Sequence, residues 1–248
     1  MTEQHDTGIG LVGFDADDTL WRSQDFFDQA QLEFEHILGR YVDLDDSRAR
    51  QRLYAVEKGN IALFGYGVKG MSLSMIEAAI DITGARIEAA DIGRILRLAK
   101  DMLQHPVELL PGIREAVEAV AARYEVVLIT KGDLFHQEAK VRESGLQDLF
   151  PRIEIVSEKD PETYARVLEE FDLAPQRFLM IGNSLRSDVA PVLALGGWAG
   201  HMPYHVTWEH EMEADLGGHV SRMREAPDPA SLPAVVEEIA AAASAAAV

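Results

Sequence analysis

Residues 9–21 read IGLVGFDADDTLW, an apolar run that ends in three carboxylates within four positions. A short run of this kind predicts a buried β-strand, with Asp15, Asp17 and Asp18 just beyond its end. Crowded carboxylates repel one another, so a cation or a shared proton must offset their charge. The cluster therefore predicts a Mg²⁺ site with oxygen ligands. Taken alone, an Asp-x-Asp sequence would more simply be a turn in which Asp18 or Thr19 caps a helix.

Four more short apolar runs follow along the chain, mostly with helical stretches between them. Runs of this length predict buried parallel strands, and their alternation with helices is typical of an α/β protein. Asp-Pro and Leu-Pro-Gly sequences mark the starts of two of the helices. The predicted strands are 9–14, 126–129, 153–156, 178–181 and 198–202, and these two helices are 112–122 and 161–171.

The first two predicted strands are separated by roughly 110 residues, far more than a crossover helix requires. Apolar residues at helical spacing fill most of this insertion, at 26–38, 47–64, 73–84 and 87–103. We therefore predict a Rossmann-like parallel-sheet core at residues 1–21 and 106–248, with an inserted all-helical cap domain at 22–105. The alanine-rich tail, residues 240–248, is predicted to be a frayed end.

A glycine-rich break interrupts the insertion at residues 65–70. Its glycines would let this loop approach an active site, where Lys69 could meet an anionic group of a substrate. An ordinary turn between two helices explains the same glycines equally well. The aromatic residues Trp21, Phe26, Phe27 and Phe34 lie at helical spacing and are interpreted as the hydrophobic core of the cap.

Polar side chains also follow the later strands. Thr130 and Lys131 end the second predicted strand, Lys159 follows the third, and Asn183 and Asp188 follow the fourth. Each is ordinary by itself: a strand-end hydroxyl, a surface lysine or an acid on a helix surface. In open α/β sheets, however, active sites gather at the carboxyl ends of the strands. Their joint occurrence after successive strands therefore favours one shared site.

In this order, the Asp15–Thr19 segment, Thr130, Lys159 and the segment that begins at Asn183 resemble the four motifs of the haloacid dehalogenase-like (HAD) superfamily. The helical insertion resembles that family's first-type cap. The resemblance implies a Mg²⁺-dependent phosphomonoester hydrolase that acts on a small phosphorylated metabolite through an aspartyl-phosphate intermediate. The phosphatase branch is favoured because the dehalogenase branch has no carboxylate at the position of Asp17.

The resemblance also assigns roles. Asp15 is the nucleophile, and Asp17 is the acid that protonates the leaving alcohol and the base that activates water. Thr130 and Lys159 hold the oxygens of the transferring group. Lys131, beside Thr130, is predicted to bind substrate as well.

The implied metal ligands are Asp15, the backbone carbonyl of Asp17, and the segment after the fourth strand. Asn183 stands where the family usually has an aspartate that binds the metal directly. Its amide oxygen can coordinate Mg²⁺, and Asp188 can supply charge directly or through water. The sequence leaves open which of Asn183 and Asp188 is the direct ligand.

Other readings remain. The chain could be a catalytically weak or binding-only HAD-like protein, with Asn183 marking a lost metal site, or a dehalogenase-type hydrolase. A signalling receiver domain also uses clustered aspartates, but its phosphorylated aspartate follows the third strand of a shorter domain. The histidines His201, His205 and His210 lack the tight spacing of a zinc site.

The composition of the chain disfavours some classes of binding partner. The chain of 248 residues contains no cysteine and has a formal net charge of −19, which disfavours nucleic acid and anionic membranes. It contains no apolar run of the length needed to span a bilayer, and residues 1–8 lack the pattern of a secretion signal. We therefore expect a cytoplasmic protein whose partner is a small phosphorylated substrate. The sequence does not indicate its oligomeric state.

Overall fold

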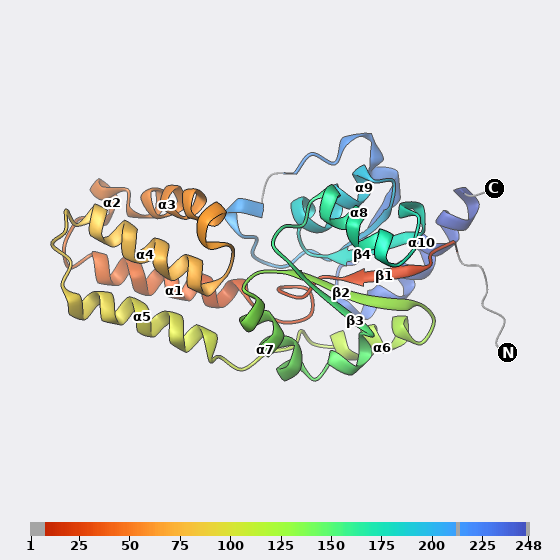
Figure 1. Ribbon diagram of the computed structural model, residues 1–248, viewed down its shortest axis with the longest axis horizontal. Helices are drawn as coiled ribbons and strands as arrows, with labels where there is room; N and C mark the ends of the chain where they lie inside the picture. Colours follow the sequence, from red (N-terminus) through yellow and green to blue (C-terminus); the bar gives the residue numbers. More distant parts are fainter. Residues whose placement is uncertain (1–7, 212–213, 247–248) are drawn as a thin grey trace. The chain divides into compact units, whose positions relative to one another are not determined.

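The computed structural model describes residues 8–211 and 214–246. These residues divide into two compact units. The α/β unit contains residues 8–22, 107–131 and, from 140 onward, the rest of the described chain; the helical unit contains residues 23–106 and 132–139 (Figure 1). Within the described residues, no helix combines the length and apolarity needed to cross a membrane. That the helical unit acts as a cap stays a prediction.

The α/β unit is built on one parallel sheet of six strands, in the order β3-β2-β1-β4-β5-β6. The α/β prediction is therefore confirmed, and all five predicted strands are present with ends shifted by a few residues. The sixth strand was not predicted because its sequence, Met-Arg-Glu, offers no apolar run. The strands are β1 Leu11–Phe14, β2 Glu125–Lys131, β3 Arg152–Val156, β4 Phe178–Gly182, β5 Trp198–His201 and β6 Met223–Glu225.

The register of the three central strands brings their carboxyl ends together. Phe14 of β1 pairs with Leu128 of β2 on one side and with Ile181 of β4 on the other. The backbone N–H of Asp15 continues the ladder by donating to the Ile181 carbonyl at 2.8 Å. Asp15 thus emerges between the loops that follow β2 and β4.

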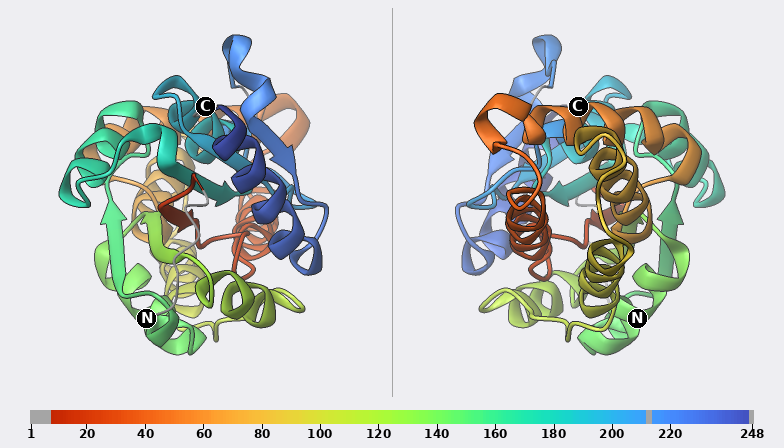
Figure 2. Two further views of the ribbon diagram at one scale, coloured as in Figure 1. Left: turned by 90° about the vertical axis from the view of Figure 1, so that its right-hand side faces the viewer. Right: turned by 90° about the vertical axis from the view of Figure 1, so that its left-hand side faces the viewer.

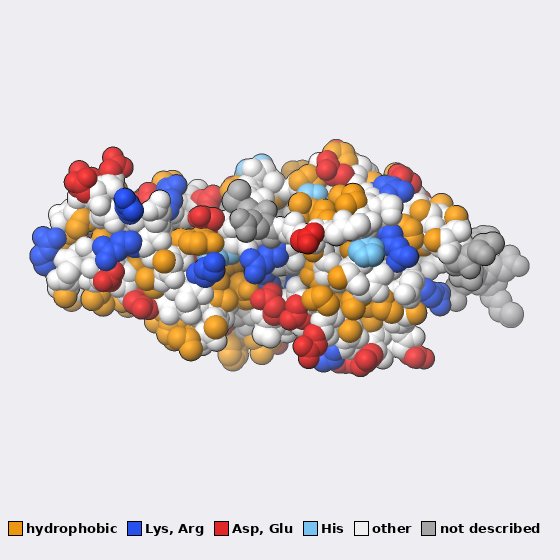
Figure 3. Space-filling view, turned by 90° about the horizontal axis from the view of Figure 1, so that it is seen from above, with side chains coloured by type: hydrophobic (Ala, Val, Ile, Leu, Met, Phe, Trp, Pro, Cys, Tyr) orange, Lys and Arg blue, Asp and Glu red, His pale blue; other side chains and the backbone are white. Residues whose placement is uncertain are grey.

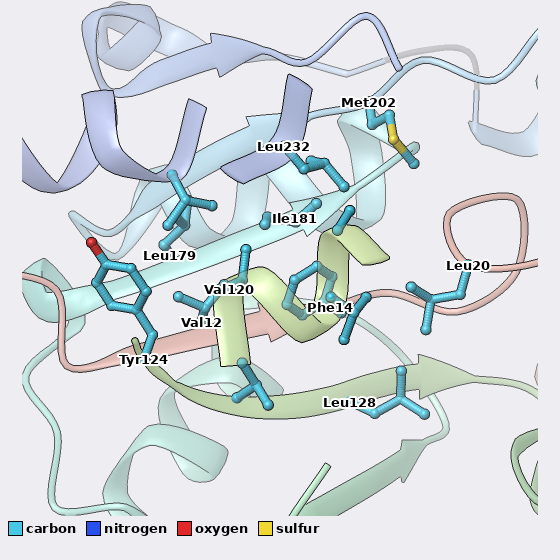
Figure 4. Close-up of a cluster of buried hydrophobic side chains, with 14 of the residues drawn as sticks. Val12, Phe14, Leu20, Val120, Tyr124, Leu128, Leu179, Ile181, Met202 and Leu232 are labelled. Carbon is cyan, nitrogen blue, oxygen red and sulfur yellow. The ribbon is translucent and has the colours of Figure 1, made fainter. Parts of the chain in front are cut away.

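Both faces of the sheet are covered by helices, which is why these strands read as continuous apolar runs. On one face Val12, Phe14 and Ile181 pack with helices α6 and α10, as Figure 4 shows for part of this cluster. On the other face Leu11 and Met180 pack with α8 and α9. Figure 2 shows α10 and α8 on opposite sides of the sheet. The helices of this unit are α6 Ile113–Ala121, α8 Pro161–Glu170, α9 Ala190–Ala194 and α10 Leu232–Ala246, and α7, Leu134–Ser144, is divided between the two units.

Short helical turns connect these elements. The 3₁₀ turns are Gln147–Leu149, Pro175–Arg177, Glu209–Glu211, Gly217–Arg222 and Pro229–Ser231, and one wider π-turn covers Leu185–Val189.

The alanine-rich end of the chain is not frayed over its described part. Ala240 and Ala243 of α10 are buried in the core of the α/β unit. Near them, a Cβ added to Gly8 would lie 2.7 Å from the backbone nitrogen of Ser244, so Gly8 and α10 approach closely. Small side chains allow that approach, and the predicted frayed end is wrong up to residue 246. Residues 247–248 lie outside the described part.

The helical unit has its own hydrophobic core, in which Phe34 and Leu38 pack with Met75, Ala78 and Ile95. Its helices are α1 Gln24–Leu38, α2 Leu44–Ser47, α3 Ala49–Phe64, α4 Val68–Ile82 and α5 Ala89–Leu103. The predicted break at 65–70 is shorter than expected, because α4 begins at Val68. Trp21 belongs to the core of the α/β unit, which corrects its assignment to the cap.

On the face drawn in Figure 3, lysine and arginine side chains are scattered among acidic and apolar ones. The positive charge on that face is therefore not gathered into a continuous patch.

Candidate active site

The turn after β1 presents the aspartates. The Ala16 carbonyl accepts hydrogen bonds from the backbone N–H groups of Thr19 and Leu20, and Asp18 adopts a left-handed conformation with φ of 62°. Aspartate tolerates that region better than most residues. Ala16 and Leu20 are fully buried and hold the turn in place, while Asp15 stays at the end of the strand.

Asp15 lies in a buried charge cluster. The Lys159 ammonium donates to Asp15 Oδ1 and, at 2.7 Å, to Asp188 Oδ1. The side chains of Lys159 and Asp188 are each only 1% exposed. The structure therefore brings together three of the predicted site residues, one from each of the loops after β1, β3 and β4.

This cluster leaves negative charge incompletely compensated. Burial, together with the neighbouring Asp188 carboxylate, raises the pKa of Asp15 to about 7, although Lys159 opposes the shift. Burial would lower the pKa of Lys159, but the Asp15 and Asp188 carboxylates outweigh it and raise that pKa, so the side chain stays an ammonium. One positive charge faces two carboxylates, and a further cation would be stabilised here.

Thr19 joins the loops after β1 and β4. Its hydroxyl donates to Asp15 Oδ2 at 3.0 Å and accepts from the Asn183 backbone N–H at 3.1 Å. The side-chain amide of Asn183 consequently points back toward the turn of the aspartates. The position held by its Oδ1 is 3.3 Å from Asp15 Oδ2 and 3.2 Å from the Asp17 carbonyl oxygen.

The side-chain amide of Asn183 can face Asp15 Oδ2 and the Asp17 carbonyl oxygen in two orientations. With its nitrogen toward them, it donates to both in the absence of a metal. With its oxygen toward them, that oxygen lies 3.3 Å from one and 3.2 Å from the other, close to the roughly 3 Å between neighbouring ligands of an octahedral Mg²⁺ ion. The residues present therefore fit Mg²⁺, through Asp15 Oδ2, the Asp17 carbonyl and the Asn183 amide oxygen.

Asp188 has other partners than these three oxygens. Its Oδ2 accepts from the Ser184 backbone N–H at 2.9 Å, and a Cβ on Gly182 would lie 2.2 Å from the same oxygen. Asp188 thus supports Lys159 and the loop that carries Asn183, and a direct bond to metal stays a prediction. In the described parts of the chain, no three His, Asp or Glu side chains form a metal site.

Asp17 has partners that the sequence did not point to. Lys140 Nζ lies 2.6 Å and 2.7 Å from its two carboxylate oxygens, and Trp21 Nε1 donates to Oδ1 at 2.6 Å. Lys140 sits in α7, nine positions beyond β2, in a helix without a distinctive motif. Its role could be found only once the fold had placed it beside Asp17.

Lys131 forms a hydrogen bond to the segment that follows β4. Its ammonium donates to Ser187 Oγ at 2.8 Å and to the carboxylate of Glu211, which the sequence analysis did not single out. Burial raises the pKa of Glu211, but Lys131 and hydrogen bonds from Ser184 and Ser187 outweigh burial and lower it. Thr130 is buried at the end of β2. Substrate binding by Thr130 and Lys131 stays a prediction.

Lys69 belongs to the helical unit. Its ammonium lies 2.8 Å and 2.9 Å from the two carboxylate oxygens of Asp133, and its side chain is 48% exposed. The ammonium is also 5.2 Å from the centre of the Phe135 ring. Lys69 therefore has partners within its own unit, and its predicted contact with substrate remains to be tested.

Comparison with known proteins agrees with this architecture. The family model for haloacid dehalogenase-like hydrolases matches residues 9–196, which contain all the predicted motifs. The chain belongs to this family. The resemblance noted in the sequence is thereby confirmed, and the protein is a HAD-like hydrolase.

Solved structures of other HAD-like proteins resemble the chain along most of its length. A haloacid dehalogenase-like family hydrolase from Xanthomonas campestris is 59% identical, with a TM-score of 0.87, and the match covers 96% of this chain and 98% of that one. A 2-haloacid dehalogenase from Pseudomonas syringae is 18% identical, with a TM-score of 0.61 and coverage of 93% and 99%. A HAD-hydrolase from Bacillus subtilis bound to magnesium is 17% identical, with a TM-score of 0.62 and coverage of 92% and 98%.

The last two similarities are those of the fold alone. The search of curated proteins found no match to the chain. The reaction of this HAD-like hydrolase must therefore be argued from its own site.

Proposed function

We propose that this hydrolase is a Mg²⁺-dependent phosphomonoesterase that acts on a small phosphorylated metabolite through an aspartyl phosphate on Asp15. The convergence of Asp15 Oδ2, the Asp17 carbonyl and the Asn183 amide is the observation that carries the proposal. Three hard oxygen ligands beside a carboxylate nucleophile suit chemistry on a phosphate dianion, whose charge a divalent cation offsets. Displacement of a halide from carbon has no comparable need for a cation.

In the first step an Asp15 carboxylate oxygen attacks phosphorus. The bond from Asp15 oxygen to phosphorus forms while the bond from phosphorus to the ester oxygen breaks. Asp17 gives its proton to the departing oxygen, which leaves as an alcohol. Lys159 remains an ammonium beside Asp15, and Thr130 at the end of β2 is proposed to help hold the transferring oxygens.

In the second step Asp17 acts as the base. It accepts a proton from a water molecule as the water oxygen attacks phosphorus, and the bond to Asp15 breaks to release inorganic phosphate. Both aspartates return to their starting forms. Asp15 Oδ2, the Asp17 carbonyl and the Asn183 amide oxygen would hold Mg²⁺, which would supply positive charge that offsets the phosphate dianion.

An assay of phosphate release tests the proposal. Purified protein should release phosphate from an aryl phosphate with Mg²⁺, lose this activity on chelation, and regain it when Mg²⁺ is added back. A panel of sugar phosphates and nucleotides then addresses the substrate. Inactivity toward the aryl phosphate and the whole panel, with Mg²⁺ present, would overturn the proposal.

A second candidate is hydrolysis of a 2-haloacid. It is favoured by the similar fold of the Pseudomonas syringae dehalogenase and by the neutral Asn183 at the position where the phosphatases carry an aspartate. The same preparation should be assayed for halide release from 2-chloropropionate without metal. Halide release without phosphate release would select this reaction over the phosphatase, whereas loss of both would leave a binding-only protein.

A further inference from the structure

The Asp17 carboxylate accepts hydrogen bonds from two side chains, those of Lys140 and Trp21. From α7, Lys140 Nζ contacts Oδ1 at 2.6 Å and Oδ2 at 2.7 Å, so one ammonium spans both oxygens. The Lys140 side chain is 13% exposed and that of Asp17 is 28% exposed. A fully exposed pair of this kind would contribute little, because water screens it and two flexible chains must be ordered. Here the lysine is largely sheltered, and its geometry spans the whole carboxylate.

Trp21 supplies the second contact, from its ring nitrogen to Asp17 Oδ1 at 2.6 Å. The Trp21 ring is buried in the core of the α/β unit and cannot follow a rotating carboxylate. The terminal torsion of an aspartate side chain is otherwise broad and weakly defined. Donors from two separate elements therefore fix the plane of the one carboxylate that the proposed reaction uses to move protons.

Another residue of α7 already packs into the core of the α/β unit. Val141, next to Lys140, is buried in that core. Arg142, two residues beyond Lys140, is exposed. The Lys140 ammonium instead ends on both oxygens of a carboxylate two residues from Asp15.

We infer that Lys140 is a positioning residue that orients the Asp17 carboxylate for proton transfer to the leaving group. This inference rests on the proposed function. It predicts that the effect of losing Lys140 depends on how much the leaving group needs a proton. Alkyl phosphates leave as strongly basic alkoxides and need Asp17 most, whereas aryl phosphates leave as weakly basic phenolates.

The variants to compare are Lys140→Met, Lys140→Arg and the matched control Arg142→Met, which removes a positive charge from the same helix. For Lys140→Met we expect kcat on an alkyl phosphate to fall about tenfold or more, and kcat on an aryl phosphate by less than about threefold. KM should change little for either substrate. Lys140→Arg should retain more alkyl-phosphate turnover than Lys140→Met, and Arg142→Met should match the wild type.

A double-mutant cycle shows whether the effect passes through Asp17. In an Asp17→Asn background, Lys140→Met should cause no further loss, because the carboxylate that it orients is already gone. Equal losses of alkyl and aryl turnover, or a full additional loss in the Asp17→Asn background, would show that Lys140 acts structurally and overturn the inference.

A crystal structure of Lys140→Met shows the orientation of the Asp17 carboxylate directly, and this test does not depend on the substrate. We expect the Asp17 carboxylate to rotate or to occupy more than one orientation, and an unmoved, well-ordered carboxylate would overturn the inference. Wild-type protein that is inactive on both kinds of ester counts instead against the proposed function. The two failures are therefore distinguishable.

Discussion

Each unit of the molecule contains an aspartate that is almost completely buried, and the two are neutralised in different ways. In the helical unit, Asp91 accepts from the Tyr41 hydroxyl and pairs with Arg40 at 2.7 Å and Arg94 at 3.1 Å. Those arginine side chains are 45% and 53% exposed, so their charge remains in contact with water. In the α/β unit, Asp188 pairs with Lys159, whose ammonium is itself buried and also serves Asp15.

The two ion clusters differ in their balance of charge. Around Asp91 two cations meet one carboxylate, and the Tyr41 hydrogen bond, opposed by burial but aided by the arginines, lowers the pKa of Asp91. Around Asp15 the balance is reversed: one ammonium faces two carboxylates, and burial together with Asp188 raises the pKa of Asp15. Such a deficit of positive charge is what the proposed binding of a cation would relieve.

The largest effect should come from Asp15→Asn, which removes the proposed nucleophile and one of the two crowded carboxylates. We expect phosphatase turnover to fall by at least roughly 10⁴-fold, because an amide cannot attack phosphorus. The melting temperature should not fall, since Lys159 keeps Asp188 as its partner. The measurements are phosphate release and thermal unfolding, with the exposed Asp148→Asn as control. Substantial residual turnover in a clean preparation would refute the nucleophile assignment.

The next test changes the charge of the proposed metal site. Asn183→Asp adds a negative charge next to Asp15 Oδ2, so the Mg²⁺ concentration for half-maximal activity should decrease severalfold. Asp188→Asn removes the carboxylate that supports Lys159 and the Asn183 loop, so that concentration should rise, or activity should be lost. Activity is measured against Mg²⁺ concentration for the three proteins. An unchanged metal requirement in both variants would remove this segment from the site.

Asp91→Asn should have the opposite character to Asp15→Asn, lowering stability without changing kcat on an aryl phosphate. Because the pKa of Asp91 is lowered in the folded protein, its stabilisation is complete well above the ordinary aspartate value of about 3.9 and is lost as the pH falls through and below it. The difference in unfolding free energy between wild type and Asp91→Asn should therefore shrink in acid.

Denaturant unfolding at pH 7 and at about pH 3.5 measures that difference. Asp101→Asn, an exposed acid on the same helix, is the control and should show little effect at either pH. A stability difference that persists undiminished in acid would mean that the cluster acts through packing and not through charge.

Lys69→Ala should have the smallest effect. Its pair with Asp133 is half-exposed, so the melting temperature should hardly change. If Lys69 contacts the remote part of the substrate, KM should rise for the best substrate of the panel and stay constant for a small aryl phosphate. Lys58→Ala, an exposed lysine on α3, is the matched control. Equal responses to both substrates, or none, would identify the loop as a connector.

The sequence predicted the parts of this molecule that are recorded in local patterns. The apolar runs located five of the strands, and polar residues directly after them located Asp15, Lys159 and Asn183. The strand order was not predictable, because nothing local states that β1 lies between β2 and β4. The three-residue β6 was missed because an edge strand of mixed polarity has no periodic signal.

Other parts depend on tertiary contacts. Lys140 and Glu211 look like ordinary surface residues until α7 and the 209–211 turn are placed beside Asp17 and Lys131. Trp21 was assigned to the wrong unit because helical spacing cannot show which core an aromatic ring enters. The alanine tail was misjudged because its small side chains are what allows close packing, which a propensity argument does not see.

The central place of β1 has a consequence for how the protein is made. The N–H of Asp15 is completed by the carbonyl of Ile181, which lies 166 positions later in the chain. At roughly 5–20 residues per second, a ribosome needs on the order of ten to thirty seconds to cover that distance. During this time β1, an apolar strand, has left the ribosome but cannot yet pair with β4. Asp15 is thus synthesised well before the strand that completes its backbone hydrogen bonding.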